Sequence, residues 1–127
     1  MHRITKNVAG GFLEITVWGF WQAEEIPGFA DDLRQALREF PCSKSLYNFT
    51  DAAIQPQDVV AAMQGMARSS DFTGRKVALY TEGAFARMQA KRVAAVGYNM
   101  QVFGSRADAI AWLAADPVEP ALIAYSV

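Results

Sequence analysis

Residues 75–115 constrain the fold of this chain more than any other stretch, because strand-like and helix-like patterns alternate there. The apolar run at 76–81 predicts a strand, and residues 84–97 predict a helix. A second strand is predicted at 100–103, and a helix capped by Ser105 is predicted over 105–115. This β-α-β-α order is typical of an α/β fold in which parallel strands are covered by helices.

The N-terminal half predicts a hairpin followed by more strands and helices. Strands are expected at 4–8 and 12–18, joined at Gly10 and Gly11, which can adopt the positive φ of a tight turn. An amphipathic helix is expected to begin between Ala23 and Pro27 and to end at Pro41. A third strand at 45–50 and a helix opened by Pro56 complete the predicted elements.

These elements predict one α/β domain over residues 1–115, with a mixed sheet of about five strands packed by about four helices. A length of 127 residues fits a single domain. Residues 116–127 form an apolar C-terminal extension that would expose large side chains if it stayed in water. We therefore expect it to dock on its own domain or on a neighbouring subunit, and the second case would make a homodimer.

Composition narrows the classes of function. Twelve basic residues against 13 acidic ones leave a net charge of −1, which argues against nucleic-acid binding. The basic pairs 75–76 and 91–92 are interpreted as solvated surface. No apolar run reaches the roughly 20 residues of a membrane span, and the N-terminus does not resemble a signal peptide. With Cys42 as the one cysteine, a reduced cytoplasmic setting is expected.

Candidate catalytic groups are few, and the chain is interpreted as a non-enzyme. His2 is the sole histidine and is expected at a frayed terminus, which leaves no histidine for a metal cluster or a nucleophile pair. Cys42 follows a helix end, where the dipole disfavours a thiolate. Two acidic pairs are possible, Glu24 with Glu25 and Asp51 with Asp58. Of these residues, Glu24, Glu25 and Asp58 are better explained as first-turn helix residues. We expect neither a metal nor a cofactor.

Strand alternation predicts two sheet faces of different character. The first would carry Leu13, Ile15, Val17, Leu46, Val77, Leu79, Met100 and Val102, and the second Phe12, Trp18, Tyr47, Phe49, Tyr80 and Phe103. The aromatic face is either a second core layer or the lining of a groove for an apolar ligand. Trp18, Phe20 and Trp21 are expected to be partly exposed, and Phe85 is expected on the buried arc of its helix.

In the order of these segments and in their residue patterns, the chain resembles proteins of the STAS superfamily. Within that superfamily it resembles the SpoIIAA-like (STAS/SEC14-type) group of small stand-alone bacterial proteins. The segments that carry the resemblance are 12–19, 37–40, 46–51, 76–81, 102–103 and 109–113. Together they extend over nearly the whole chain up to Ala115. The resemblance implies a mixed sheet of four or five strands and a non-enzymatic role in binding.

The resemblance also points to the loop after the third strand. Antagonist members of the superfamily carry an Asp-x-Ser-Gly phosphoacceptor there, and phosphorylation abolishes binding to a partner kinase. In this chain Asp51 matches the aspartate, whereas Ala53 stands in place of the serine and Ile54 in place of the glycine. The resemblance therefore implies a partner-binding loop that lacks the phosphoacceptor hydroxyl.

Two functional hypotheses follow. The leading one is a non-catalytic STAS-like interaction or regulatory module, which would contact a protein partner through Thr50, Asp51, Ala53, Gln55 and Gln57. The alternative is a binder of a small apolar molecule or lipid, in a groove lined by Trp18, Tyr47, Phe49, Tyr80 and Phe103.

Overall fold

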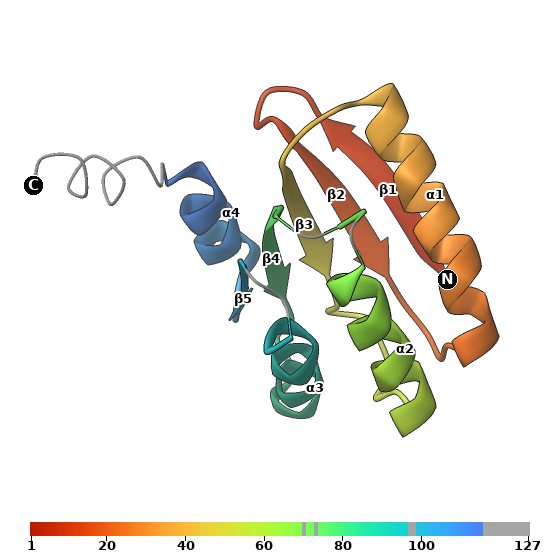
Figure 1. Cartoon of the computed structure of the whole chain (residues 1–127). Helices are drawn as coiled ribbons and strands as arrows, with labels where there is room; N and C mark the ends of the chain where they lie inside the picture. The colour runs from red at the N-terminus through yellow and green to blue at the C-terminus, as the bar shows by residue number, and fades with distance from the viewer. Residues whose placement is uncertain (70, 73, 97–98, 116–127) are drawn as a thin grey trace, which may run out of the picture.

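A computed structural model describes residues 1–69, 71–72, 74–96 and 99–115, which form a sheet with helices on both faces (Figure 1). The elements, in chain order, are β1 (His2–Asn7), β2 (Phe12–Val17), a 3-10 turn η1 (Ala23–Glu25), α1 (Ile26–Glu39), β3 (Lys44–Asn48), α2 (Gln57–Arg68), β4 (Lys76–Tyr80), α3 (Ala84–Ala94), β5 (Met100–Phe103) and α4 (Arg106–Ala114). The predicted extension at 116–127, and Gly97 at the predicted end of the third helix, lie outside the described residues.

The five strands lie side by side in their order along the chain. β1 pairs with β2 antiparallel, and β2, β3, β4 and β5 pair in parallel. Val77 pairs with Met100 and Leu79 pairs with Val102, so the two strands first identified in the sequence are neighbours. The predicted α/β class with a five-stranded mixed sheet and four helices is confirmed.

The two elements with the clearest sequence signals form as predicted. In the β1–β2 hairpin, Gly11 has a φ of 70° and its amide donates to the carbonyl oxygen of Asn7 at 2.9 Å. In α1, Pro27 occupies the first turn, where its missing amide proton removes no helical hydrogen bond. The buried stripe of α1 consists of Ile26, Phe29, Ala30 and Leu33.

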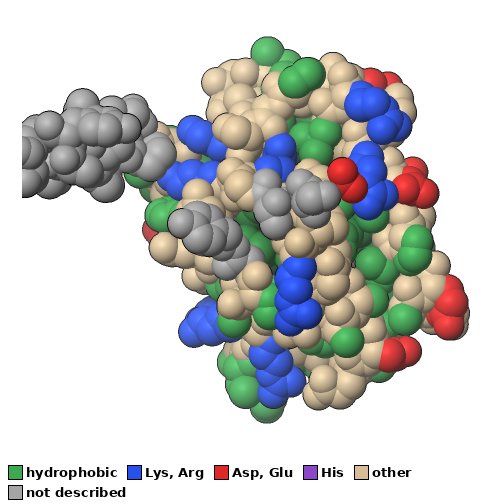
Figure 2. Space-filling view, viewed as in Figure 1, with side chains coloured by type: hydrophobic (Ala, Val, Ile, Leu, Met, Phe, Trp, Pro, Cys, Tyr) green, Lys and Arg blue, Asp and Glu red, His purple; other side chains and the backbone are tan. Residues whose placement is uncertain are grey.

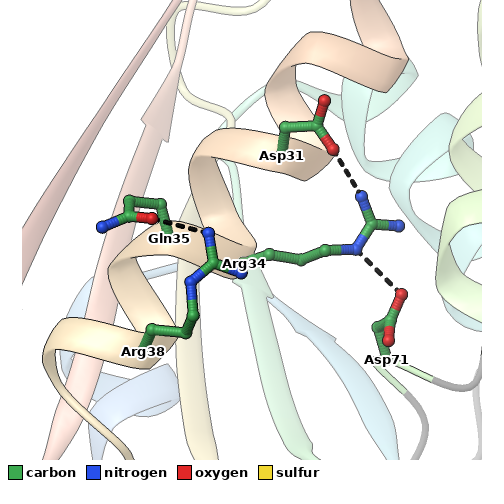
Figure 3. A network of polar contacts seen from close by, with 5 residues as sticks. All are labelled: Asp31, Arg34, Gln35, Arg38 and Asp71. Atoms are coloured by element: carbon green, nitrogen blue, oxygen red, sulfur yellow. Dashed lines mark hydrogen bonds and ion pairs between the residues drawn. The ribbon is translucent and has the colours of Figure 1, made fainter.

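A polar network fastens the exposed side of α1 to the segment before β4 (Figure 3). Arg34 binds Asp31 through Nη1 and Asp71 through Nε, both at 2.8 Å. Arg38, one turn later, donates to Gln35 of the same helix. These groups are largely solvent-exposed, so each pair contributes about 0–1 kcal/mol. The network therefore adds little to the stability of the fold.

Two hydrophobic layers sandwich the sheet. The larger layer lies under α1, α2 and α3 and contains the buried side chains Leu13, Ile15, Val17, Tyr47, Val77 and Leu79 of the strands. The smaller layer lies under α4 and joins Phe12, Leu46, Ala78 and Tyr80 to Ala109 and Leu113. α4 contacts mainly β4, with fewer contacts to β3 and β5.

The predicted assignment of β3 side chains to the two faces was wrong. Leu46 lies under α4, whereas Tyr47 and Phe49 lie in the larger layer with Leu13 and Leu79. The pairing of Tyr47 with Ile15 and Leu79 fixes this register. Since β3 carries large apolar side chains at consecutive positions, alternation within the strand cannot tell one face from the other.

Several side chains are more firmly held than their sequence positions suggested. His2 lies in β1, where its Nε2 is 2.8 Å from Asp32 Oδ2 and its ring packs edge-on against Phe29. Arg75 donates to the carbonyl oxygens of Cys42 and Lys44 and to Ser45 Oγ. The frayed terminus predicted for His2 and the solvated surface predicted for Arg75 were therefore wrong.

Lys76 is likewise engaged at the C-terminus of α4. Its Nζ donates to the carbonyl oxygens of Trp112 at 2.6 Å and Ala115 at 2.7 Å, and it sits over the Trp112 ring. A cation at this position compensates the negative end of the helix dipole. The interpretation of Lys76 as solvated surface was also wrong.

Candidate interaction surface at the carboxyl edge of the sheet

The loop between β3 and α2 runs along the edge where the parallel strands end. Thr50 lies near the start of the loop, and its amide donates to Asn48 Oδ1 at 2.9 Å. Asp51 and Gln57 are exposed as well, while Ala53 is half-buried. Three of the five predicted partner-binding residues thus present their side chains to solvent.

A short parallel contact joins this loop to the segment that follows β2. The Gly19 amide donates to the Asp51 carbonyl at 3.2 Å, and the Ala53 amide donates to the Gly19 carbonyl at 3.3 Å. Gly19 has a φ of 77°, a conformation that glycine adopts without strain. The backbone around Asp51 is consequently held in place.

Gln55 ties the loop to the rest of this edge. Its Oε1 accepts from the Trp21 amide at 2.9 Å, and its Nε2 donates to the carbonyls of Gly19 at 2.9 Å and Ala53 at 2.7 Å. Gln89 of α3 exchanges two further hydrogen bonds with the Gln55 backbone. Gln55 is 9% exposed, so its side chain serves to position the loop, and its direct contact with a partner stays a prediction.

Behind the loop lies a narrow crevice with mostly apolar walls. Its lining combines small side chains of the loop and of α3 with larger ones. The lining residues include Ala52, Ala53, Ala86, Trp21, Phe49 and Met63. The free space is about 30 Å³, room for a methyl-sized group or a single water.

Four exposed apolar side chains surround this region, and we term them the carboxyl-edge patch. They are Phe20 at 70% exposure, Ile54 at 47%, Phe85 at 74% and Met88 at 54%. Each adjoins, along the chain, a residue that lines the crevice. The expected exposure of Phe20 is confirmed, whereas Trp21 is buried at 3% and the buried position predicted for Phe85 was wrong.

The residues proposed to line an apolar groove do not share a surface. Tyr47 and Phe49 stack in the larger core layer with ring centroids 5.9 Å apart. Tyr80 and Phe103 belong to the layer under α4, and Phe103 packs against Trp112 at 5.6 Å. Trp18 is half-buried just after the end of β2. A single groove lined by all five is thus contradicted.

The core void next to Tyr47 is also small. It measures about 40 Å³, whereas pockets for small ligands occupy roughly 300–1,000 Å³. Burial raises the pKa of the Tyr47 phenol, which therefore stays protonated, and the smaller effect of Arg75 opposes this rise. The aromatic side chains near Tyr47 act as core.

Tyr80 lies beside an ion pair at the margin of the α4-covered layer. Arg106 binds Glu14 through both its Nη2, at 2.7 Å, and its Nε, at 3.0 Å. Burial raises the pKa of Tyr80, and the negative charge of Glu14 raises it further. This polar cluster lies on the sheet face opposite α1–α3 and is separate from the carboxyl-edge patch.

The described residues also bear on two other classes of site, metal centres and membrane-spanning helices. Across the ranges described, no three His, Cys, Asp or Glu side chains are grouped so that they could hold a metal ion. Of the helices seen, none has the length and apolarity needed to cross a membrane.

Comparison with known proteins identifies the fold. No family model matches the chain, and neither does any curated protein. Among solved structures, the anti-sigma factor antagonist SpoIIAA in its unphosphorylated form is similar, with a TM-score of 0.62 and 13% identity over 89% of this chain and 96% of that one. An uncharacterised DUF3478 protein with a SpoIIAA-like fold, from Shewanella loihica, has a TM-score of 0.61 and 16% identity, over 89% and 92%. The chain has a STAS, SpoIIAA-like fold.

Proposed function

We propose that this SpoIIAA-like domain is a non-catalytic module that binds a protein partner through the carboxyl edge of its sheet. The observation that carries the proposal is the concentration of exposed apolar side chains beside the loop at 50–57. Solvent-exposed apolar patches rimmed by polar residues mark interaction surfaces. SpoIIAA, whose fold this chain shares, is an antagonist of an anti-sigma factor and so belongs to a class of regulatory proteins.

The way polar groups are used at this edge supports binding over chemistry. Gln55 and Gln89 are occupied by hydrogen bonds that hold the backbone. A rigid scaffold under an exposed loop lowers the entropy lost on binding. Ala53, at the position of the phosphoacceptor serine, has no hydroxyl, so regulation here would not use that phosphorylation. The cytoplasmic setting expected from the composition is part of the same proposal.

The proposal is tested by reversing one charge on the loop. The tagged protein is used to capture partners from an extract of its own cells, with Asp51→Arg as the variant and Glu39→Arg as the matched control on the exposed end of α1. Asp51→Arg should lower recovery of the partner by about tenfold or more. The reason is that placing like charges together at an interface, or burying a charge there without a partner, costs several kcal/mol of binding free energy. Glu39→Arg should leave recovery unchanged.

Two results would contradict the proposal. One is equal recovery of every captured protein by wild type and Asp51→Arg, with both variants shown to be folded by circular dichroism. The other is a stoichiometric apolar molecule found with the purified protein by native mass spectrometry, which would instead favour ligand binding.

Dimer formation through residues 116–127 remains a separate prediction. Light scattering of the full chain and of a chain that ends at Ala115 would test it. A dimer that becomes monomeric on truncation is the expected result, and an identical mass per particle for both chains would contradict it.

A further inference from the structure

The helices of this protein do not all lie on one face of the sheet. α1, α2 and α3 follow β2, β3 and β4 and lie over the larger layer, whereas α4 follows β5 and lies on the opposite face (Figure 1). The chain therefore leaves the carboxyl ends of β4 and β5, which pair in parallel, toward opposite faces. Open α/β sheets bind ligands at such a topological switch point, outside the carboxyl ends of the strands.

The start of α3 presents backbone donors at this switch point. Gly83 is the N-cap of α3 and has no side chain that could accept from the first-turn amides. The Arg87 amide donates to the Gly83 carbonyl at 2.9 Å, so the amides of residues 84–86 precede the first helical hydrogen bond. Because the first turn of α3 contains no acidic residue, its positive dipole end is available to an anion.

Thr81 places a buried hydroxyl beneath this helix start. Its amide donates to the Phe103 carbonyl at 3.2 Å, which extends the β4–β5 pairing by one residue. Alternation along β4 then puts the Thr81 side chain on the face of Val77 and Leu79, the face that α3 covers. Thr81 is 0% exposed, and no described residue gives its Oγ1 a hydrogen-bond partner. A buried hydroxyl without a partner is rare and points to a group that binds there.

Arg87 reaches from α3 across to the other loop of the switch point. Its Nη2 donates to the Glu82 carbonyl at 3.3 Å, and the same atom is 3.3 Å from where a Cβ on Gly104, between β5 and α4, would stand. Its Nε is buried and has no acceptor among the described residues. The guanidinium thus holds one long hydrogen bond and keeps donors for an oxyanion.

The segment that carries these donors has a positive excess. Over residues 81–94 the cations are Arg87, Lys91 and Arg92, and the carboxylate is Glu82. In Figure 2, Lys and Arg side chains lie over α3, whereas Asp and Glu side chains gather toward α1.

Four carboxylates lie in or beside the loops of the switch point, and they limit the affinity for an anion. Glu14 is neutralised by Arg106 at 2.7 Å and 3.0 Å. Asp108 lies in the first turn of α4, on the other face of the sheet. Glu82 and, in the neighbouring loop, Asp51 are exposed, so solvent and salt screen their charges. Weak binding, in the millimolar range, is the expectation for a simple anion.

We propose that this switch-point site, formed by Thr81, the amides of residues 84–86 and Arg87, binds the phosphate group of a soluble phosphomonoester. Arg87 would turn from the Glu82 carbonyl toward the phosphate, and the Thr81 hydroxyl would donate to one of its oxygens. Donors that converge from several directions suit a tetrahedral oxyanion better than a planar carboxylate. The site goes beyond the proposed function and does not depend on it.

The test titrates sodium phosphate, and glycerol 3-phosphate in a second arm, into the full-length ¹⁵N-labelled protein. Sodium chloride keeps the ionic strength constant, and binding is followed by NMR. Both compounds should shift the amides of residues 83–86 and the Arg87 Nε–H signal in a saturable way. Acetate, a planar anion, should bind more weakly.

Variants connect the binding to the site. Arg87→Gln should weaken glycerol 3-phosphate by about tenfold or more, because a charged hydrogen-bond donor is lost, and Thr81→Val should weaken it by about fivefold. Arg92→Gln makes the same change of charge in the last turn of α3 and should alter the affinity by less than about twofold. In phosphate-free buffer, Thr81→Val should melt no lower than the wild type, because the hydroxyl it removes has no partner to lose.

Several outcomes would overturn the inference. They are the absence of saturable shifts at residues 83–87, equal affinity of the wild type and Arg87→Gln, acetate binding as tightly as phosphate, or a lower melting temperature for Thr81→Val without phosphate. Arg87-dependent binding to vesicles containing phosphatidic acid, without a response to glycerol 3-phosphate, would also overturn it, because the ligand would then be a lipid. Capture of a cellular partner through Asp51 is unaffected by any of these results.

Discussion

Gln55 is the residue through which the stability of the carboxyl edge is most directly tested. The perturbation is Gln55→Leu, which keeps the approximate size of the side chain and removes its three hydrogen bonds. The residue is nearly buried, and the Trp21 amide that it satisfies belongs to a residue that is 3% exposed. The matched control is Gln57→Leu, two residues further on and exposed at the start of α2.

The expected loss can be estimated bond by bond. A buried amide left without a partner costs about 1–3 kcal/mol, which applies to Trp21. The Gly19 carbonyl keeps its hydrogen bond from the Ala53 amide, and the Ala53 carbonyl is part-buried and can be rehydrated. Loss of the bond from Gln55 to each of these two carbonyls should therefore lower the free energy of unfolding by a further ~0.5–1 kcal/mol. Gln55→Leu should therefore lower the free energy of unfolding by about 2–5 kcal/mol. At about 4 °C per kcal/mol for a chain of this length, the Tm should fall by about 8–20 °C.

Urea denaturation followed by circular dichroism measures the free energy of unfolding, and hydrogen exchange of the Trp21 amide measures the local opening. Gln57→Leu should change the free energy by no more than about 0.5 kcal/mol. A loss below about 1 kcal/mol for Gln55→Leu, or an unchanged exchange rate at Trp21, would refute the view that Gln55 organises this edge.

Three further changes test the core and its supports. Tyr47→Phe should leave the free energy of unfolding near neutral pH almost unchanged but should reduce the loss of stability seen above about pH 10. Burial raises the Tyr47 pKa in the folded state, so the unfolded chain deprotonates first as the pH rises. Identical alkaline denaturation curves for the variant and the wild type would contradict this. Leu113→Ala, at 1% exposure, should cost about 2–5 kcal/mol in urea denaturation, and a cost under about 1 kcal/mol would show that α4 is not firmly docked. Arg75→Met should cost about 1–3 kcal/mol by thermal melting because it leaves the buried Ser45 hydroxyl without this donor, and an unchanged Tm would argue against the contact.

The sequence predicted local features well where the signal is local. The glycines of the hairpin, the amphipathic stripe of α1 and the Ser105 cap of α4 act over a few residues, and all form as predicted; the Ser105 hydroxyl accepts from the Asp108 amide. The parallel β4–β5 pairing also follows from the alternation of elements, since a crossover helix must cover the sheet. Local propensity and long-range packing agree at these positions.

Predictions that depended on distant residues were less successful. Phe85 has the same helical spacing as buried residues of α3, yet it lies in the first turn, and it is exposed in the folded protein. His2 is ordered because α1, thirty residues away, supplies Asp32 and Phe29. Arg75 is engaged by the segment that enters β3. No pattern within a local window contains these partners.

The candidate surface was predicted only in part. The resemblance pointed to the loop with Asp51, but not to Phe20, Phe85 and Met88, which come from other loops and from α3. What the sequence determined by itself is the class of fold and the order of its elements, because periodicity and turn chemistry are encoded locally. What tertiary structure alone decided is which face each β3 side chain occupies and which exposed side chains meet at one edge. Those facts depend on strand register and helix docking, which are set by contacts between residues far apart in the chain.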